Sequence, residues 1–245
     1  MWVAGIDGCR TGWMAALMIL GDPASVRLRI APALAEILDG PEAPAFVAVD
    51  MPIGLPDRTL GSGRIPEQLV RPLLGARQSS VFAIPSRGSV YATDYREACA
   101  LALSTSEPPR KVSRQGFNLF PRIREMDALL RARPDLVPRV FEVHPELAFW
   151  SLNGRKPLPE PKKVKSRPYA PGLALRRGLL TKAGLPRALI EAAPPRGAGE
   201  DDLIDALAGL TVALDLATGG GQSFPDPPGR DAHGLPVAIW THRPR

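Results

Sequence analysis

The chain has 245 residues, a length that provides enough apolar side chains for the core of one large domain. Of these residues 44% are hydrophobic and 23% are charged, which is ordinary for a globular protein. The formal net charge of +6 is compatible with a polyanionic partner, although an arginine-rich composition alone can also produce it. Aromatic residues make up only 6%, which argues against a surface that stacks bases, and two cysteines without a CxxC spacing argue against a disulfide framework or a cysteine zinc site.

The amino terminus and the hydropathy bear on the location of the protein. An apolar segment begins within the first few residues, which leaves no room for a signal peptide. No apolar run reaches the roughly 18 residues that a membrane-spanning helix needs. Together with the unpaired cysteines, these features predict a cytoplasmic protein that does not contact a membrane.

The first part of the chain alternates apolar runs with short polar turns. We expect a β-hairpin from strands at 1–8 and 13–20, a half-exposed strand at 25–31, a short helix at 32–38 and a buried strand that ends at Asp50. Buried strands separated by helix are typical of parallel neighbours in an α/β sheet. The pattern therefore predicts an α/β fold.

The rest of the chain is irregular at first and then mainly helical. The pattern predicts a mostly helical insertion at 57–138, a return to the core with a short strand that ends at Glu142, and a basic, proline-rich loop at 153–171. The strongest helix prediction covers 199–218, where acidic residues occupy the first turn, and a last edge strand is expected at 235–240. We predict a single domain over residues 1–245.

Acidic residues stand where the predicted strands end. Asp7 lies near the end of the first strand, Asp50 ends a later one and Glu142 ends another. If these strands are parallel neighbours, the three acids meet at the carboxyl edge of the sheet, where α/β folds usually bind ligands. Asp202 and Asp205 are three residues apart and share one face of the last helix. These five residues are the candidate catalytic residues.

The chemistry that suits this arrangement is metal binding. Crowded carboxylates repel one another, and a divalent cation that prefers oxygen ligands removes the conflict. We predict that Asp7, Asp50, Asp202 and Asp205 bind Mg²⁺ or Mn²⁺, with Asp7 as the central ligand. Two such ions about 4 Å apart form an arrangement that hydrolyses phosphodiesters, so a two-metal site is expected.

Each acid also has a structural interpretation. Asp50 can cap the turn that follows it, and Glu142 can pair with an arginine. Asp201 and Asp202 can supply only the negative charge that favours the start of a helix. Asp205 is the hardest to explain in this way, because its helical neighbours are apolar.

Other residues are candidates for substrate binding. Arg10 and Thr11 lie in the first glycine turn, where a guanidinium group suits phosphate oxygens. His144 closely follows the strand-end glutamate and is a candidate acid, base or ligand, or simply a packed histidine. The basic segments 110–124 and 155–167 either contact a phosphate backbone or form solvated loops. Nucleic acid is therefore the expected partner.

Five motifs over nearly the whole chain resemble the domain-of-unknown-function 429 family: GIDGCRTGW, AVDMPIGLP, RQSSVFAIPSR, FEVHPELAFW and DDLIDALA. The resemblance implies a ribonuclease-H-like mixed sheet flanked by helices and a metal-dependent nuclease activity on nucleic acid. The last motif is also similar to the final helix of Holliday-junction resolvases, which implies that both Asp202 and Asp205 bind metal. A homodimer is suggested by analogy with resolvases alone. The chain departs from them in having Asp50 where they have glutamate, and in the large insertion that follows.

Two other functions remain open. GIDGCRTG is similar to the first phosphate loop of sugar kinases and actin-like ATPases, which would imply ATP-dependent phosphoryl transfer with Thr11 and its neighbouring glycines at the phosphate. Those enzymes generally need a longer chain with two such domains, and neither a second loop of this kind nor a Walker motif occurs here. The other alternative is a nucleic-acid-binding protein that has kept the fold and lost turnover.

Overall fold

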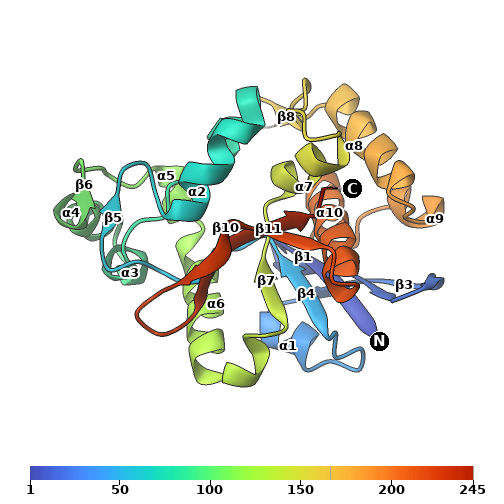
Figure 1. The fold of residues 1–245 in the computed structure, drawn as a ribbon, viewed down its shortest axis with the longest axis horizontal. Coiled ribbons are helices and arrows are strands. Elements are labelled where there is room, and N and C mark those ends of the chain that lie inside the picture. The colour runs from blue at the N-terminus through green and yellow to red at the C-terminus, as the bar shows by residue number, and fades with distance from the viewer. Residues whose placement is uncertain (166, 245) are drawn as a thin grey trace.

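The core of the protein is a five-stranded mixed sheet with the order β3-β2-β1-β4-β7 (Figure 1). The computed structural model describes residues 1–165 and 167–244. The strands of this sheet are β1 (Trp2–Cys9), β2 (Gly12–Ile19), β3 (Asp22–Ala31), β4 (Phe46–Val49) and β7 (Val140–Glu142). Neighbouring strands are antiparallel from β1 to β3, whereas β4 runs parallel to both β1 and β7. The expected α/β architecture with an amino-terminal hairpin is confirmed.

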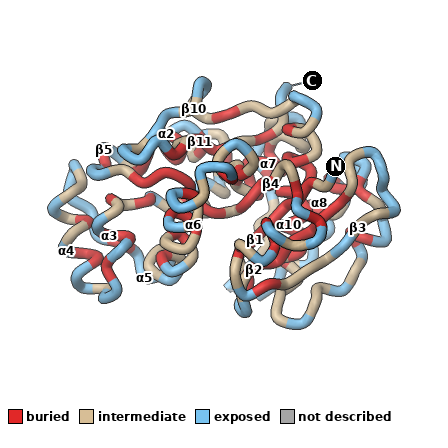
Figure 2. Tube along the Cα trace, turned by 90° about the horizontal axis from the view of Figure 1, so that it is seen from below, coloured by how far each residue is buried: buried red, intermediate tan, exposed pale blue. Residues whose placement is uncertain are grey.

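Helices cover both faces of the sheet. The helices α1 (Leu34–Leu38) and α6 (Phe120–Ala132) pack on one face, and α8 (Ala170–Lys182) and α10 (Glu200–Ala217) pack on the other. Alternate residues of β1 enter these two cores, because side chains of a strand point to opposite faces. Figure 2 shows the buried trace running through β1 and α10. Within the described part of the chain, no helix is long and apolar enough to cross a membrane.

The connection between β4 and β7 is long and mostly helical. It contains β5 (Thr59–Leu60), α2 (Ile65–Val70), the 3₁₀ helix η1 (Arg71–Ser80), α3 (Arg87–Tyr91), α4 (Tyr95–Thr105), β6 (Ser106–Glu107), α5 (Arg114–Phe117), α6 and η2 (Pro134–Leu136). A kink at Gly75 divides η1, with a φ of +51° that an L side chain rarely adopts. In Figure 1, α3 and α4 lie far from the sheet, whereas α2 leads back toward its carboxyl edge.

The C-terminal part ends in a hairpin outside the main sheet. Its elements are α7 (Pro145–Leu152), β8 (Lys163–Val164), β9 (Arg167–Pro168), α8, α9 (Arg187–Ile190), α10, β10 (Gly221–Arg230) and β11 (Pro236–His242). The expected last strand exists as β11, but it is not an edge strand of the core: it pairs with β10, and beside β7 it forms the isolated Val143–Trp240 bridge and packs the Trp240 ring against Phe141. The sequence did not predict β10, because its prolines lack the amide hydrogen that pairing between strands needs. The pairing of β10 with β11 shifts in register between Phe224 and Gly229, which accommodates these prolines.

The backbone of α10 lies directly on the sheet. A Cβ atom on Gly5 would lie 2.0 Å from both the Ala206 carbonyl oxygen and the Leu210 amide nitrogen. A Cβ atom on Gly209 would lie 3.1 Å from the carbonyl oxygen of Ala48. The two glycines therefore set the distance between the helix and the strands β1 and β4.

This contact predicts a large loss of stability in Gly5→Ala. The added methyl group overlaps backbone atoms, which cannot turn aside as a side chain can, so the free energy of unfolding should fall by about 3 kcal/mol, the upper end of the range for overpacking. Gly178→Ala in α8 is the matched control: its Cβ meets no atom within 4 Å, and helix propensity should raise stability by up to about 1 kcal/mol. Urea unfolding measures both, and equal stability of Gly5→Ala and the wild type would contradict the close packing.

Candidate metal centre

The register of the sheet places Asp7 beside Asp50. Gly5 on β1 is paired with Ala48 on β4, and the two aspartates follow these residues by two positions on parallel strands. They therefore point to the same face of the sheet, toward α10. The Asp50 amide donates a hydrogen bond of 2.9 Å to the Ile6 carbonyl oxygen, which continues the pairing one residue beyond β4.

The helix α10 brings Asp205 to the same point. Asp205 precedes Gly209 by four residues, so both lie on the helix face that contacts the sheet. Four helical residues span about 6 Å, and two strand residues span about 7 Å. Gly209 contacts Gly5 and Ala48. The carboxylates lie two residues further along each strand and four residues back along the helix, so all three are at a similar distance from this contact.

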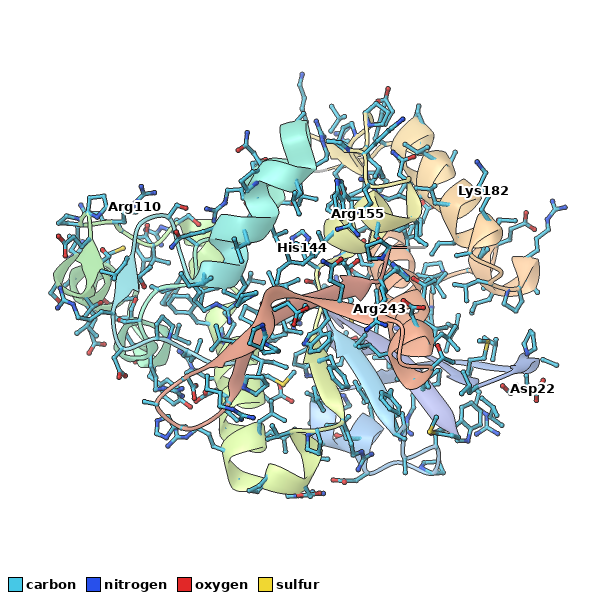
Figure 3. All side chains as sticks on the ribbon, in the orientation of Figure 1. Asp22, Arg110, His144, Arg155, Lys182 and Arg243 are labelled. Atoms are coloured by element: carbon cyan, nitrogen blue, oxygen red, sulfur yellow. The ribbon has the colours of Figure 1, made fainter. Side chains whose placement is uncertain are left out.

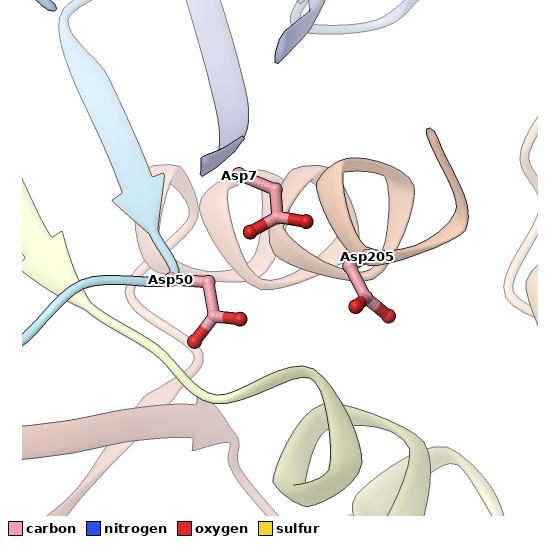
Figure 4. Close-up of side chains that lie close together, drawn as sticks. All are labelled: Asp7, Asp50 and Asp205. Carbon is pink, nitrogen blue, oxygen red and sulfur yellow. The ribbon is translucent and has the colours of Figure 1, made fainter. Parts of the chain in front are cut away.

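The three carboxylates form a compact cluster (Figure 4). One oxygen from each of Asp7, Asp50 and Asp205 lies within 4.8 Å of the others. Asp205 is only 2% exposed, and its Oδ1 is buried and accepts no hydrogen bond. A buried carboxylate oxygen without a partner is costly, and a hard cation would satisfy it. Oxygens bound to one Mg²⁺ lie up to about 4.2 Å apart, so a small closure of the cluster fits this ion.

Burial and mutual repulsion raise the pKa values of the strand-end acids. The pKa of Asp7 lies well above its ordinary value because the carboxyl is buried and because Asp50 and Asp202 repel its charge, while Lys162 acts in the opposite direction. Burial likewise raises the pKa of Asp50, against the lowering effects of His144 and Lys162. The cluster therefore holds protons more tightly than isolated aspartates do, and a metal ion has to displace them.

Lys162 provides a positive charge inside the cluster. Its Nζ donates a hydrogen bond to Asp205 Oδ2. The loop that carries it is fixed to α8: the Tyr169 amide donates to the Lys162 carbonyl oxygen at 2.9 Å, and buried Arg176 donates to the Glu160 carbonyl oxygen at 3.0 Å. In the metal-free protein this ammonium group is the cation that Asp205 contacts.

The other acids of the last helix have different partners. Asp202 lies outside the cluster of three, and its Oδ2 accepts a 2.8 Å hydrogen bond from the Gly199 amide at the start of α10. In this structure Asp202 caps the start of α10 through Oδ2, and its role as a metal ligand stays a prediction. Asp201, which the sequence marks only as a helix-start charge, forms an ion pair of 2.5 Å with Lys163 beside the cluster.

Glu142 is not part of the cluster either. The Arg64 guanidinium donates to both of its carboxylate oxygens, at 2.5 and 3.1 Å, and the Ile53 amide adds a bond of 2.8 Å. Burial raises the pKa of Glu142 to about 7, while Arg64 has the opposite effect. These bonds tie the end of β7 to the segment after β4, which is the arginine pairing that the sequence allows for Glu142, and its catalytic role stays a prediction.

The predicted substrate residues separate into two places. Arg10 and Thr11 are exposed in the turn between β1 and β2, and neither lines the cavity above the carboxylates. His144 does line it, with Nε2 3.3 Å from the Ser80 carbonyl oxygen and a buried Nδ1 that has no partner. In Figure 3, His144 lies near the middle of the molecule, between α2 and α7.

A cavity of about 500 Å³ opens above the carboxylate cluster. Five basic residues line it that the sequence did not single out one by one: Arg64, Arg77, Arg122, Lys162 and Lys163. They come from the start of α2, η1, α6 and the loop before β8, so no local spacing connects them. The only sequence signal is that Arg122 and the two lysines fall within the basic segments 110–124 and 155–167. The cavity thus has basic residues beside Asp7 and Asp50, but Glu67, Glu142, Glu146 and Asp201 line it as well, and Arg64, Lys162 and Lys163 are ion-paired with acidic residues.

The family can now be stated. The family model described as "Protein of unknown function (DUF429)" matches residues 5–230. The chain belongs to this family. The matched region includes all three clustered aspartates, Asp7, Asp50 and Asp205. No curated protein and no solved structure matches the chain.

The ion pair with Asp205 predicts that Lys162→Met binds Mn²⁺ more tightly. The ammonium group and the metal compete for the same carboxylate, so its removal should lower the dissociation constant several-fold at pH 8. Isothermal titration calorimetry measures this, with Lys165→Met as the control because it makes the same change of charge at an exposed position of the same loop. Weaker binding by Lys162→Met would mean that Lys162 helps to build the metal site.

The raised pKa of Asp7 predicts a pH dependence of stability and metal binding. Between the ordinary value of 3.8 and the raised value, the folded protein binds more protons than the unfolded chain, so the stability of the metal-free protein falls as pH rises through this window. The apparent affinity for Mn²⁺ should rise over the same window, because binding releases protons. Calorimetry in buffers of different ionisation enthalpy measures that release, and Asp7→Asn should reduce it.

Proposed function

We propose that this protein is a divalent-metal-dependent nuclease that hydrolyses phosphodiesters of nucleic acid. The observation that carries the proposal is the convergence of Asp7, Asp50 and Asp205, with one buried Asp205 oxygen that has no partner, beside a cavity that Asp7 and Asp50 line together with several basic residues. Carboxylate ligands favour Mg²⁺ or Mn²⁺, and basic walls favour an anionic substrate.

The strand arrangement supports a ribonuclease-H-like assignment. Three antiparallel strands are followed by two strands parallel to the first, and a late helix crosses β1 with its aspartate above the strand ends. This is the arrangement that the sequence motifs imply for a nuclease of that superfamily. It supports the proposal through the positions of Asp7, Asp50 and Asp205 rather than through the fold alone.

In this mechanism the side chains of the protein bind the metal ion, orient the phosphodiester and neutralise its negative charge. Asp7, Asp50 and Asp205 would hold the ion, which supplies Lewis-acid activation of water and stabilises negative charge on phosphate. Lys163 and Arg122, both on the cavity wall, would attract and orient the phosphodiester. A second ion would need Asp202, whose Oδ2 is engaged by the Gly199 amide, so the geometry supports one ion more directly than two.

The first glycine turn is arranged poorly for the alternative function, ATP-dependent phosphoryl transfer. Arg122 covers Gly8 so closely that a Cβ there would lie 2.8 Å from its side chain. The same guanidinium donates to the carbonyl oxygens of Cys9 and Gly12. On this side the turn therefore presents carbonyl oxygens to an arginine, which is not the row of free amide groups that a phosphate loop needs.

The decisive experiment is a nuclease assay on wild type and Asp205→Asn. With Mn²⁺ the wild type should hydrolyse bis(p-nitrophenyl) phosphate and an oligonucleotide panel. The loss of one metal ligand should lower kcat/KM by at least about 100-fold, or about 2.7 kcal/mol in the transition state. Glu36→Gln removes the same charge at an exposed position of α1 and should retain full activity.

Two other results would lead to different conclusions. Equal hydrolysis rates for Asp205→Asn and the wild type would contradict the assignment of the carboxylate cluster as the active site. Affinity for nucleic acid without hydrolysis, in all divalent metals tried, would favour the non-catalytic binding protein.

A further inference from the structure

The five basic residues that line the cavity differ in what they already contact, and four of them have partners inside the protein. Lys162 and Lys163 form ion pairs with two aspartates of α10. Arg64 donates to both carboxylate oxygens of Glu142, and Arg122 donates to two backbone carbonyl oxygens of the first glycine turn. The charges of Lys163 and Arg122 still attract an anion, but part of their hydrogen-bonding capacity is already in use.

Arg77 is the fifth of these residues, and its guanidinium group is free. Within residues 1–165 and 167–244 it forms no hydrogen bond and no ion pair, although several acids line the same cavity. The side chain is half-buried, and its Nε is a buried donor without an acceptor. Such donors are costly, and native proteins leave few of them. An anion that enters the cavity would supply the acceptor that the chain does not.

The backbone that carries Arg77 is tied to a residue beside Asp50. Ser80 Oγ donates a hydrogen bond of 2.8 Å to the Arg77 carbonyl oxygen, and the Ser80 carbonyl oxygen lies 3.3 Å from Nε2 of His144. His144 is close enough to Asp50 for its charge to lower the pKa of that carboxyl. All three of Arg77, His144 and Asp50 line the one cavity. The end of η1 is therefore held next to the carboxylates, while the Arg77 guanidinium keeps its donors unused.

A free guanidinium group in the cavity that Asp7 and Asp50 line suits a phosphate. The group is planar, and two of its N–H donors can bond two oxygens of one phosphate side by side, which an ammonium group cannot do. It also keeps its positive charge at any pH at which the protein is folded. A neutral substrate would leave the buried Nε unsatisfied, so the group selects for negatively charged oxygens.

We infer that Arg77 binds the phosphate of the substrate, through Nε and one terminal nitrogen of its guanidinium group. The inference rests on the proposed nuclease function and adds to it the residue that holds the phosphodiester. Contacts to phosphate carry no sequence information, so Arg77 should contribute equally to the binding of nucleic acids of any base composition.

Hydrolysis of bis(p-nitrophenyl) phosphate with Mn²⁺ tests the role of Arg77 in substrate binding. Arg77→Met should lower kcat/KM at least about tenfold, mainly through a higher KM, because the lost contact serves bound substrate and transition state alike. Arg77→Lys keeps the charge without the paired donors and should recover only part of the loss. Arg96→Met, which removes the same charge at an exposed position of α4, should match the wild type. An unchanged KM in Arg77→Met would overturn the inference.

The salt dependence of binding keeps this test distinct from a failure of the proposed function. Fluorescence anisotropy with EDTA present measures the affinity for short labelled oligonucleotides over a range of NaCl concentrations. Arg77→Met should weaken binding equally for different base sequences and reduce the slope of log K against log salt concentration by about 1, as the loss of one phosphate contact does. Arg96→Met should leave the slope unchanged. These results are expected even if no diester is hydrolysed, which would reject the nuclease alone. Equal slopes for Arg77→Met and the wild type, or no binding by the wild type, would reject the inference.

Urea unfolding separates a binding role of Arg77 from a structural one. Because the guanidinium group has no partner in the free protein and leaves a buried donor unsatisfied, Arg77→Met should be at least as stable as the wild type. Weaker phosphate binding without a loss of stability is the combination that the inference requires. A clear fall in the urea midpoint of Arg77→Met would show that Arg77 serves the fold, and the inference would be wrong.

Discussion

The contact between the backbone of α10 and the strands β1 and β4 is the constraint on which the site depends. Gly5, Ala48 and Gly209 meet without intervening side chains, so the helix has one possible height above the sheet. From this point, two residues along each strand and one turn back along the helix lead to the three carboxylates. A larger residue at Gly5 or Gly209 would move Asp205 away from Asp7 and Asp50. The contact that holds the helix against the sheet therefore also holds the carboxylate cluster together.

Electrostatics then decides what the cluster can do. Three carboxylates buried together are costly, and the raised pKa values of Asp7 and Asp50 reflect that cost. Lys162 offsets part of it in the metal-free protein through its bond to Asp205. The same lysine lies on the cavity wall, where a phosphate would approach. A metal ion bound at this cluster would therefore compete with Lys162 for Asp205.

The sequence predicts the parts of the site that depend on local pattern and fails where distant segments meet. Asp7 and Asp50 were found because buried strands end in acids, and Asp205 because it interrupts an apolar helix face. Asp202 lies on the same helix face but one turn closer to the helix start, where the Gly199 amide donates a hydrogen bond to its Oδ2. Glu142 also ends a strand, but Arg64, far away in the sequence, neutralises it. The position of Lys162 depends on the anchoring of its loop by Arg176, which periodicity does not encode.

The placement of α10 near the end of the chain has a consequence for biosynthesis. Asp7 and Asp50 leave the ribosome long before Asp205, because chain synthesis proceeds from the amino terminus. Until α10 arrives, one apolar face of β1 and β4 has no cover. A nascent chain therefore carries an exposed sheet face and two of the three clustered acids, and a stalled or truncated chain that lacks α10 would be unable to assemble the cluster and prone to aggregate. The pairing of α10 with β1 restricts the complete carboxylate cluster to chains that have been synthesised at least through α10.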